Sequence, residues 1–245
     1  MKIPYMDLRV QSKKKKKQLL LAVDRVLSHG RIILGPEVKQ FEDEIASICQ
    51  TKYAVGQGSG TDALYMALRS LDIGPGDEVI TTPLSWIATV NAITLCGAKP
   101  VFVDIGEDMN INVGLIEGAI TEKTKAILPV HYTGRICDMA KISRIASEKS
   151  IFIVEDAAQA FGANIHGAMA GSFGEVSAFS MNAMKGLNSY GEAGAVVTNS
   201  EVLESKLRSL TYAGTINKED CHYPSLNARM DTIQAAMLLV SLEYL

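Results

Sequence analysis

The sequence predicts an α/β fold with a mostly parallel, seven-stranded sheet covered by helices on both faces. From residue 53 onward, short apolar runs rich in β-branched residues alternate with longer amphipathic stretches. The runs are apolar at successive positions, which is typical of parallel strands that are buried on both faces. The chain has 245 residues, of which 47% are hydrophobic and 21% charged, so it is long enough to bury a sizeable core.

The elements follow one another in a regular order. A helix over 18–27 comes first, with its apolar face at Leu20, Val23 and Leu27. The strands are expected at 53–57, 78–82, 99–104, 125–131, 151–156, 175–180 and 194–198. The helices between or after them are expected at 61–71, 86–96, 113–120, 139–148, 157–162 and 202–210. We expect 1–35 to be an N-terminal segment and 36–245 to be one large domain.

Charge and cysteine usage restrict the classes of partner. With 27 acidic and 24 basic side chains the net charge is −3, which gives no overall attraction to nucleic acid or to a membrane surface. The lysine run 13–17 is interpreted as a solvated helix end, and the apolar patch 19–23 is too short to span a bilayer, so a cytoplasmic protein is expected. Reduced thiols and no metal site are expected because the four cysteines are far apart: Cys49, Cys96, Cys137 and Cys221.

The first candidate for chemistry is the glycine-rich turn GQGSGTDAL at 56–64. Glycines let the backbone approach an anion, and the start of the following helix offers unpaired N–H groups to a phosphate. The turn matches neither GxGxxG nor GxxxxGK[ST]. A tight turn capped by Ser59 or Thr61 is the alternative.

The second candidate is the carboxylate of Asp156, at the end of the apolar run 151–156. A partly desolvated carboxylate needs a cationic partner to stay ionised, and a protonated ring nitrogen would be such a partner. A structural salt bridge, or a cap of the helix at 157–162, is the alternative. Gln159 lies one expected helical turn further on and would face the same pocket.

The third candidate is Lys185, which follows the strand-end hydroxyl of Ser180 in a segment rich in Asn, Gly and Ser. A lysine on an irregular loop at a strand end is suited to form a Schiff base, because partial burial frees its nucleophilic form. A solvated surface charge is the alternative. The combination of phosphate loop, carboxylate, hydroxyl and lysine at sheet ends favours a functional site.

Eight segments in this order resemble the DegT/DnrJ/StrS family of pyridoxal-phosphate (PLP) sugar aminotransferases, which have the aspartate-aminotransferase fold. They are LGPEVKQFEDEIA (34–46), GSGTDALYMAL (58–68), GPGDEVITTPLSWIATVNAI (74–93), GAKPVFVDI (97–105), KAILPVHYTG (125–134), VEDAAQAFGA (154–163), AFSMNAMKGLNSYGEAGAVVT (178–198) and LNARMDTIQAA (226–236). The resemblance covers essentially the whole chain.

The resemblance implies a role for each matching residue. Lys185 is similar to the lysine that holds the cofactor covalently and moves the proton, and Asp156 to the carboxylate that keeps the pyridine nitrogen protonated. Trp86 matches the aromatic residue that stacks on the ring, and Gln159 the residue beside its face or hydroxyl. The phosphate-binding positions are matched by Gly60, Thr61 and Ser180, and Asn227 resembles an asparagine that reaches the phosphate in the neighbouring subunit of a homodimer.

The function implied by this resemblance is transfer of an amino group from an amino acid, with glutamate as the expected donor, to a nucleotide-linked keto-sugar. Such a reaction serves cell-surface polysaccharide or glycan synthesis. In this family a histidine in place of the lysine accompanies sugar dehydration, so Lys185 favours the aminotransferase. The substitutions Ala183 and Ala193 depart from the commoner residues of the lysine loop and remove no functional group.

The end of the chain leads to a further expectation. Family members continue into a smaller C-terminal domain, which this chain is expected to lack, so a non-catalytic fragment is one alternative function. We expect the final helix to leave six apolar side chains uncovered: Ile233, Ala236, Met237, Leu239, Val240 and Leu242. A nicotinamide-dependent dehydrogenase is a further alternative, but it lacks GxGxxG and leaves Lys185 without a role.

Overall fold

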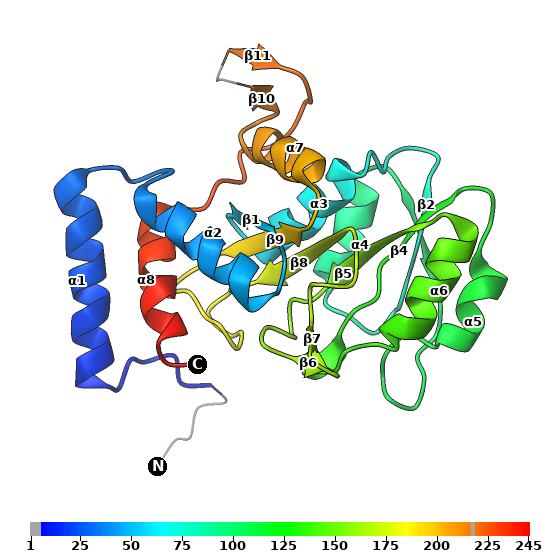
Figure 1. Ribbon diagram of the computed structural model, residues 1–245, viewed down its shortest axis with the longest axis horizontal. Helices are drawn as coiled ribbons and strands as arrows, with labels where there is room; N and C mark the ends of the chain where they lie inside the picture. Colours follow the sequence, from blue (N-terminus) through cyan, green and yellow to red (C-terminus); the bar gives the residue numbers. More distant parts are fainter. Residues whose placement is uncertain (1–5, 217–218) are drawn as a thin grey trace.

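A seven-stranded sheet forms the centre of the computed structural model, which describes residues 6–216 and 219–245 (Figure 1). The strand order is β1-β9-β8-β5-β4-β2-β3, with parallel pairing from β8 through β3 and antiparallel pairing of β9 with β8 and β1. The strands are β1 Tyr53–Gln57, β2 Glu78–Thr81, β3 Lys99–Phe102, β4 Thr124–Ile127, β5 Phe152–Asp156, β8 Val176–Ser180 and β9 Gly194–Thr198. The predicted mostly parallel sheet is therefore confirmed.

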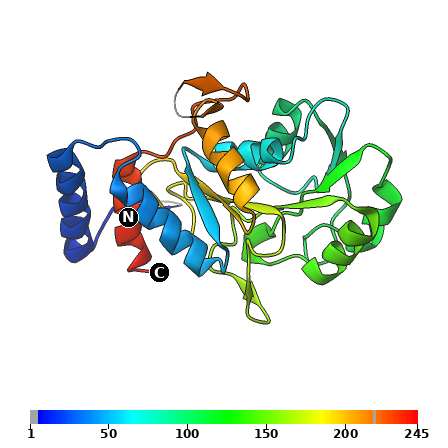
Figure 2. The same ribbon diagram turned by 45° about the horizontal axis from the view of Figure 1, so that its top comes forward.

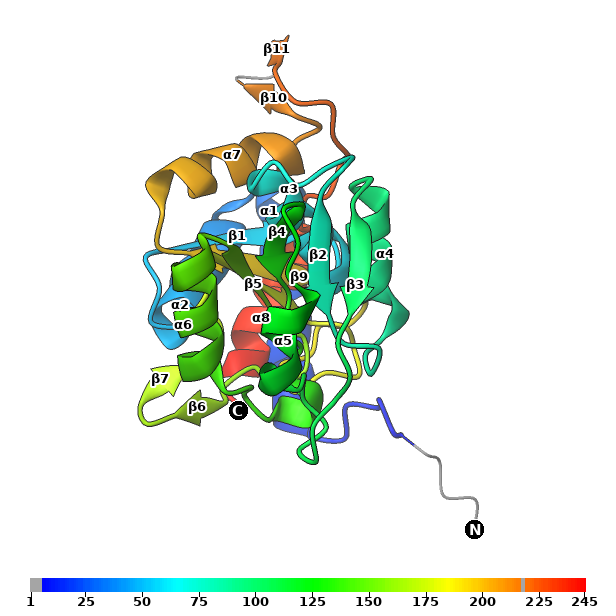
Figure 3. The same cartoon turned by 90° about the vertical axis from the view of Figure 1, so that its right-hand side faces the viewer.

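Helices cover both faces of the sheet. They are α1 Lys13–His29, α2 Pro36–Ile48, α3 Gly60–Ser70, α4 Ile87–Leu95, α5 Val113–Ala119, α6 Met139–Lys149, α7 Glu201–Thr211 and α8 Thr232–Leu242. One core cluster packs α3, α4 and α7 on Val154, whereas α5 and α6 pack on Ile153, so neighbouring β5 residues face opposite layers. Figure 3 shows α4 and α6 on opposite sides of the strands.

The ends predicted for α3, α4, α5, α6 and α7 agree with the structure to within one residue. The strand expected over 125–131 is an exception, because β4 ends at Ile127. Pro129 has no N–H to donate to a neighbouring strand, so regular pairing stops before it. Pairing resumes only as a single bridge between Val130 and Asp156.

The apolar face predicted for the first helix is wrong. Leu20 and Leu27 are exposed, and the buried side chains of α1 are instead Leu19, Ala22 and Val26. These three pack against α8, which lies beside α1 in Figures 1 and 2. Both faces of α1 carry apolar residues at helical spacing. Packing against α8, from the far end of the chain, decides which of the two is buried.

The same contact corrects the expectation for the final helix. Ala236 and Val240 of α8 are buried against α1, and the other four side chains that were expected to be uncovered are half-buried. Leu238 packs on the sheet side together with residues of α2. None of the six predicted side chains of α8 is therefore exposed.

The segment 157–162 forms turns rather than the predicted helix. It leads into the short antiparallel pair β6 Asn164–Ile165 and β7 Ala168–Met169. A second short pair, β10 Thr215–Ile216 and β11 Asp220–Cys221, projects beyond α7 at the top of Figure 2.

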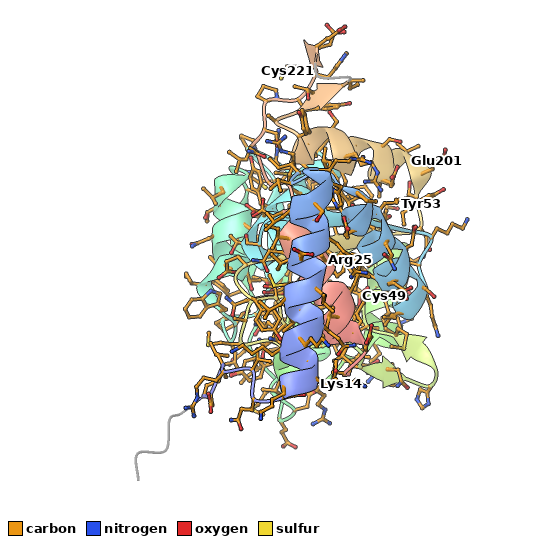
Figure 4. All side chains as sticks on the ribbon, turned by 90° about the vertical axis from the view of Figure 1, so that its left-hand side faces the viewer. Lys14, Arg25, Cys49, Tyr53, Glu201 and Cys221 are labelled. Carbon is orange, nitrogen blue, oxygen red and sulfur yellow. The ribbon has the colours of Figure 1, made fainter. Side chains whose placement is uncertain are left out.

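The remaining expectations concern cysteines, charge and the membrane. All four cysteine thiols are free, and Figure 4 shows Cys221 far from Cys49. Lys14, in the lysine run, lies on the exposed first turn of α1 (Figure 4). Within 6–216 and 219–245, we find no helix with the length and apolar character needed to cross a bilayer. Residues 1–5 of the expected N-terminal segment lie outside the described residues.

Candidate active site

A cavity of about 420 Å³ opens where β5 and β8 end and α3 and α4 begin. Every predicted site residue except Asn227 lines it: Gly60, Thr61, Trp86, Asp156, Gln159, Ser180 and Lys185. These residues come from four separate parts of the chain. They meet because β5 and β8 are parallel neighbours whose carboxyl ends lie at the same edge of the sheet.

Asp156 is the buried carboxylate of this cavity, with only 4% of its surface exposed. The Thr89 hydroxyl donates to its Oδ2 at 2.7 Å, and the N–H of Ala158 donates to its Oδ1 at 3.2 Å. Burial raises the pKa of Asp156, while these two hydrogen bonds, the nearby Lys185 amine and the His131 ring oppose that increase. The groups around Asp156 therefore stabilise its charged form only in part, and a cationic ligand would stabilise it further.

Glu155, the preceding residue, points to the other face of the sheet and is completely buried. Its Oε1 accepts from the N–H groups of Phe173 and Gly174 and from the hydroxyl of Ser177, at 2.7–2.8 Å. Its Oε2 accepts from the N–H of Gly171 and lies 2.9 Å from Nε2 of His131. Burial, the largest single effect, opposes ionisation, yet the hydrogen bonds from His131, Ser177 and Gly171 together lower the pKa of Glu155.

The buried structural contact that was the alternative for Asp156 is instead the hydrogen bond between Glu155 and His131. The N–H of Cys137 donates to Nδ1 of His131, which assigns the hydrogen on Nε2 to the contact with Glu155. Asp156 does not cap a helix, because the turns at 157–162 replace the predicted helix.

An anion-binding cradle lies at the start of α3. Ser59 is the N-cap, and its hydroxyl accepts from the N–H of Asp62 at 3.0 Å, so the predicted cap is Ser59 and not Thr61. The N–H groups of Gly60 and Thr61 occupy the first turn, where a helix offers no internal acceptor. A Cβ on Gly60 would overlap the Cβ and hydroxyl of Ser180, so only glycine allows this hydroxyl to lie against the helix start.

Lys185 lies on the irregular loop 181–193 between β8 and β9, as the sequence predicts. The loop is held by backbone hydrogen bonds, including Met181 N–H to the Ala193 carbonyl and Lys185 N–H to the Asn182 carbonyl. The Lys185 side chain is half-buried. Among ion pairs between residues that the structure describes, none involves it, so its amine is not committed to a structural contact.

Trp86 and Gln159 lie at the mouth and on the wall of the cavity. Trp86 is the N-cap residue of α4 and is 73% exposed, so its ring is available to a ligand. The N–H of Thr133 donates to Oε1 of Gln159 at 3.0 Å. Because its carbonyl oxygen is engaged, Gln159 has its amide NH₂ group left as a donor to a ligand.

The sequence reasoning missed several residues of the cavity, among them Ser85, Thr89, Asn182 and Glu192. Ser85 lies just before the N-cap residue of α4 and Thr89 four residues further on, and their hydroxyls are 2.7 Å apart. That spacing was the available signal. Asn227 is exposed outside this cavity, and its side-chain oxygen accepts from Nε of Arg229 at 2.7 Å.

The fold places the cavity at the carboxyl ends of parallel strands, where enzymes of the α/β class bind their ligands. The chain belongs to the DegT/DnrJ/EryC1/StrS aminotransferase family, which it matches over residues 13–245. It is 42% identical to the dTDP-3-amino-3,4,6-trideoxy-alpha-D-glucose transaminase of Streptomyces venezuelae, covering 100% of this chain and 65% of that protein. It is 40% identical to the UDP-2-acetamido-2-deoxy-3-oxo-D-glucuronate aminotransferase of Pseudomonas aeruginosa, covering 98% of this chain and 67% of that protein.

Solved structures agree with this assignment. S. venezuelae DesV in complex with a ketimine intermediate superimposes with a TM-score of 0.95 at 42% identity, covering 99% of this chain and 66% of DesV. NtdA from Bacillus subtilis with its bound cofactor PMP superimposes with a TM-score of 0.93 at 33% identity, covering 99% of this chain and 56% of NtdA. The chain thus spans about two thirds of the length of the two curated relatives described above, at 65% and 67%.

Proposed function

We propose that this chain binds PLP in the 420 Å³ cavity and transfers an amino group from an amino acid, with glutamate as the donor, to a nucleotide-linked keto-sugar. The observation that carries the proposal is the meeting of three groups in one cavity: the Lys185 amine, the buried Asp156 carboxylate and the free N–H groups at the start of α3. The activities of the two relatives described above support the nucleotide-sugar substrate. The 43% identical relative SpsC of Bacillus subtilis, a spore coat polysaccharide biosynthesis protein, supports polysaccharide or glycan synthesis as the context.

The cavity fits the parts of this cofactor. The first N–H groups of α3, at Gly60 and Thr61, together with the Ser180 hydroxyl, would hold the phosphate, since a helix start favours anions. Asp156 would pair with the ring nitrogen, and Trp86 would stack on the ring.

The protein groups then divide the chemistry between them. Bound PLP supplies an electron sink that stabilises negative charge at the carbon next to the substrate amine. Asp156 holds a proton on the ring nitrogen, which preserves that sink. The Gln159 NH₂ would be placed to donate to the ring hydroxyl oxygen, and the Lys185 amine would accept and return the proton at the reacting carbon.

We propose a homodimer in which Asn227 contributes to the phosphate site of the second copy. Its exposure outside this chain's own cavity supports that assignment. Asn227→Ala should weaken PLP binding in the dimer, and sedimentation of the same sample establishes the oligomeric state. Unchanged affinity in a stable dimer would contradict the contribution of Asn227.

Covalent labelling tests the proposed function directly. The protein is mixed with PLP, reduced with borohydride and digested, and the peptides are mapped. We expect the label on Lys185 and its loss in Lys185→Ala, whereas Lys149→Ala, an exposed lysine on α6, should label normally. Label on another lysine would refute the assignment. A panel of nucleotide keto-sugars, assayed with glutamate, then identifies the acceptor.

A further inference from the structure

We propose that Thr89 is a positioning residue that, together with Ser85, holds the Asp156 carboxylate oriented and ionised for the cofactor, an inference that rests on the proposed function. Thr89 lies in the first turn of α4, and its hydroxyl donates to Oδ2 of Asp156 at 2.7 Å. Its side chain faces a residue 67 positions away in the chain, so the contact joins α4 to the end of β5.

The contact is shielded from water. Thr89 is only 1% exposed and Asp156 only 4%, so solvent cannot replace the hydroxyl if it is removed. A hydrogen bond to a charged group in such surroundings contributes more than one at the surface, because the alternative is an unsatisfied carboxylate.

The direction of the hydrogen bonds makes a short relay. A threonine hydroxyl has one hydrogen, and Thr89 directs it to Asp156. The Ser85 hydroxyl, 2.7 Å from Thr89 Oγ1, must then be the donor in that second contact. Ser85 is half-buried and lines the cavity, so the relay runs from the cavity wall to the carboxylate.

Three other groups act on the same carboxylate. Lys185 approaches from the loop 181–193 and the His131 ring from the segment after β4, and both favour a lower pKa of Asp156. The Ala158 N–H, on the chain following β5, donates to Oδ1. Burial raises the pKa, and the Thr89 hydrogen bond is the largest effect opposing it. Removal of the hydroxyl should therefore raise the pKa further.

Unfolding measurements on the cofactor-free protein test this inference. Because the folded pKa of Asp156 exceeds its unfolded value, its contribution to the free energy of unfolding falls as the pH rises through the interval between the two pKa values. In Thr89→Val, which keeps the side-chain shape, that fall should extend to a higher pH than in the wild type. Thr89→Ser, which keeps the hydroxyl, should follow the wild-type curve.

The double variant separates positioning from packing. In an Asp156→Asn background, Thr89→Val should change the free energy of unfolding by the same amount at every pH, because the titrating group is gone. If Thr89→Val has that pH-independent effect when Asp156 is present as well, Thr89 is merely structural and the inference is wrong.

A PLP titration adds a second readout. The chain has a single tryptophan, Trp86, at the mouth of the cavity, so its fluorescence reports binding there. Thr89→Val should weaken PLP binding about tenfold, and Thr89→Ser should restore it. Equal affinity of Thr89→Val and the wild type would contradict the inference. A wild type that does not bind PLP would overturn the proposed function, while the cofactor-free comparison still decides whether Thr89 acts through Asp156.

Discussion

Glu155 and Asp156 are consecutive carboxylates at the end of β5, and their surroundings differ completely. Both are buried, yet Glu155 has four N–H or hydroxyl donors and the His131 ring around it, whereas Asp156 has two donors. The pKa of Glu155 is lowered and that of Asp156 is raised. The comparison teaches that burial alone does not identify a carboxylate that could bind a ligand. The carboxylate with fewer hydrogen-bond donors from the protein is the better candidate.

The neighbouring strand repeats this division. Ser177 of β8 pairs with Glu155 across the strands, and its hydroxyl donates to Oε1 at 2.7 Å. Ser180, three residues further on and so on the opposite face, lines the cavity with Asp156. On the face with Glu155 and Ser177 the polar side chains hydrogen-bond within the protein, whereas the face with Asp156 and Ser180 lines the cavity.

The largest effect is expected for Asp156→Asn. A neutral amide cannot hold the ring nitrogen protonated, so amino transfer should lose several kcal/mol of stabilisation, about a thousandfold or more in rate. The fold should be retained, because the change removes a buried charge. Steady-state kinetics and a thermal melt of the same sample check both statements. Wild-type turnover in this variant would exclude the role.

Glu155→Gln should affect stability instead. In the wild type, backbone N–H groups donate to the Glu155 carboxylate. The amide NH₂ of the glutamine is itself a donor and cannot accept from them, so we expect a loss of about 3 kcal/mol in the free energy of unfolding at neutral pH. Because the folded pKa of Glu155 lies below its ordinary value of 4.5, this loss should be full above about pH 4.5 and shrink as the pH falls through the folded pKa. Urea unfolding at several pH values measures it. A variant as stable as the wild type at pH 7 would contradict the interpretation of Glu155.

A smaller effect is expected at the two β8 serines. Ser180→Ala removes one hydrogen bond to the proposed phosphate and should weaken PLP binding about tenfold with little change in stability. Ser177→Ala is the matched control, since it should lower the free energy of unfolding and leave PLP affinity unchanged. Fluorescence titration and urea unfolding of both variants make the comparison. Equal PLP affinities of the two variants would show that the faces are not divided in this way.

The sequence predicted the sheet and most of its helices because burial on both faces leaves a clear apolar pattern. It also predicted which strand ends carry polar groups, so Asp156, Ser180 and Lys185 were found without any knowledge of their contacts. The difference between Glu155 and Asp156 was not predictable in this way. It depends on backbone N–H groups from Gly171 to Gly174, whose direction no sequence pattern specifies.

The errors have related causes. On α1, two sets of apolar residues share helical spacing, and only contact with α8 decides that Ala22 rather than Leu20 is buried. Helix propensity in 157–162 is overridden by turns that place Gln159 on the cavity wall. Thr89 was missed because its role exists only through a hydrogen bond to a distant strand.

The most direct test of the account is the protonation state of the PLP ring nitrogen, measured by ¹⁵N NMR with ring-labelled cofactor bound to the protein. Asp156 should keep this nitrogen protonated at neutral pH in the wild type and in folded Glu155→Gln, and the protonation should be lost in Asp156→Asn. If the nitrogen stays protonated in Asp156→Asn, or loses its proton in folded Glu155→Gln, then Asp156 is not the carboxylate that faces the cofactor and the division between the two residues is wrong.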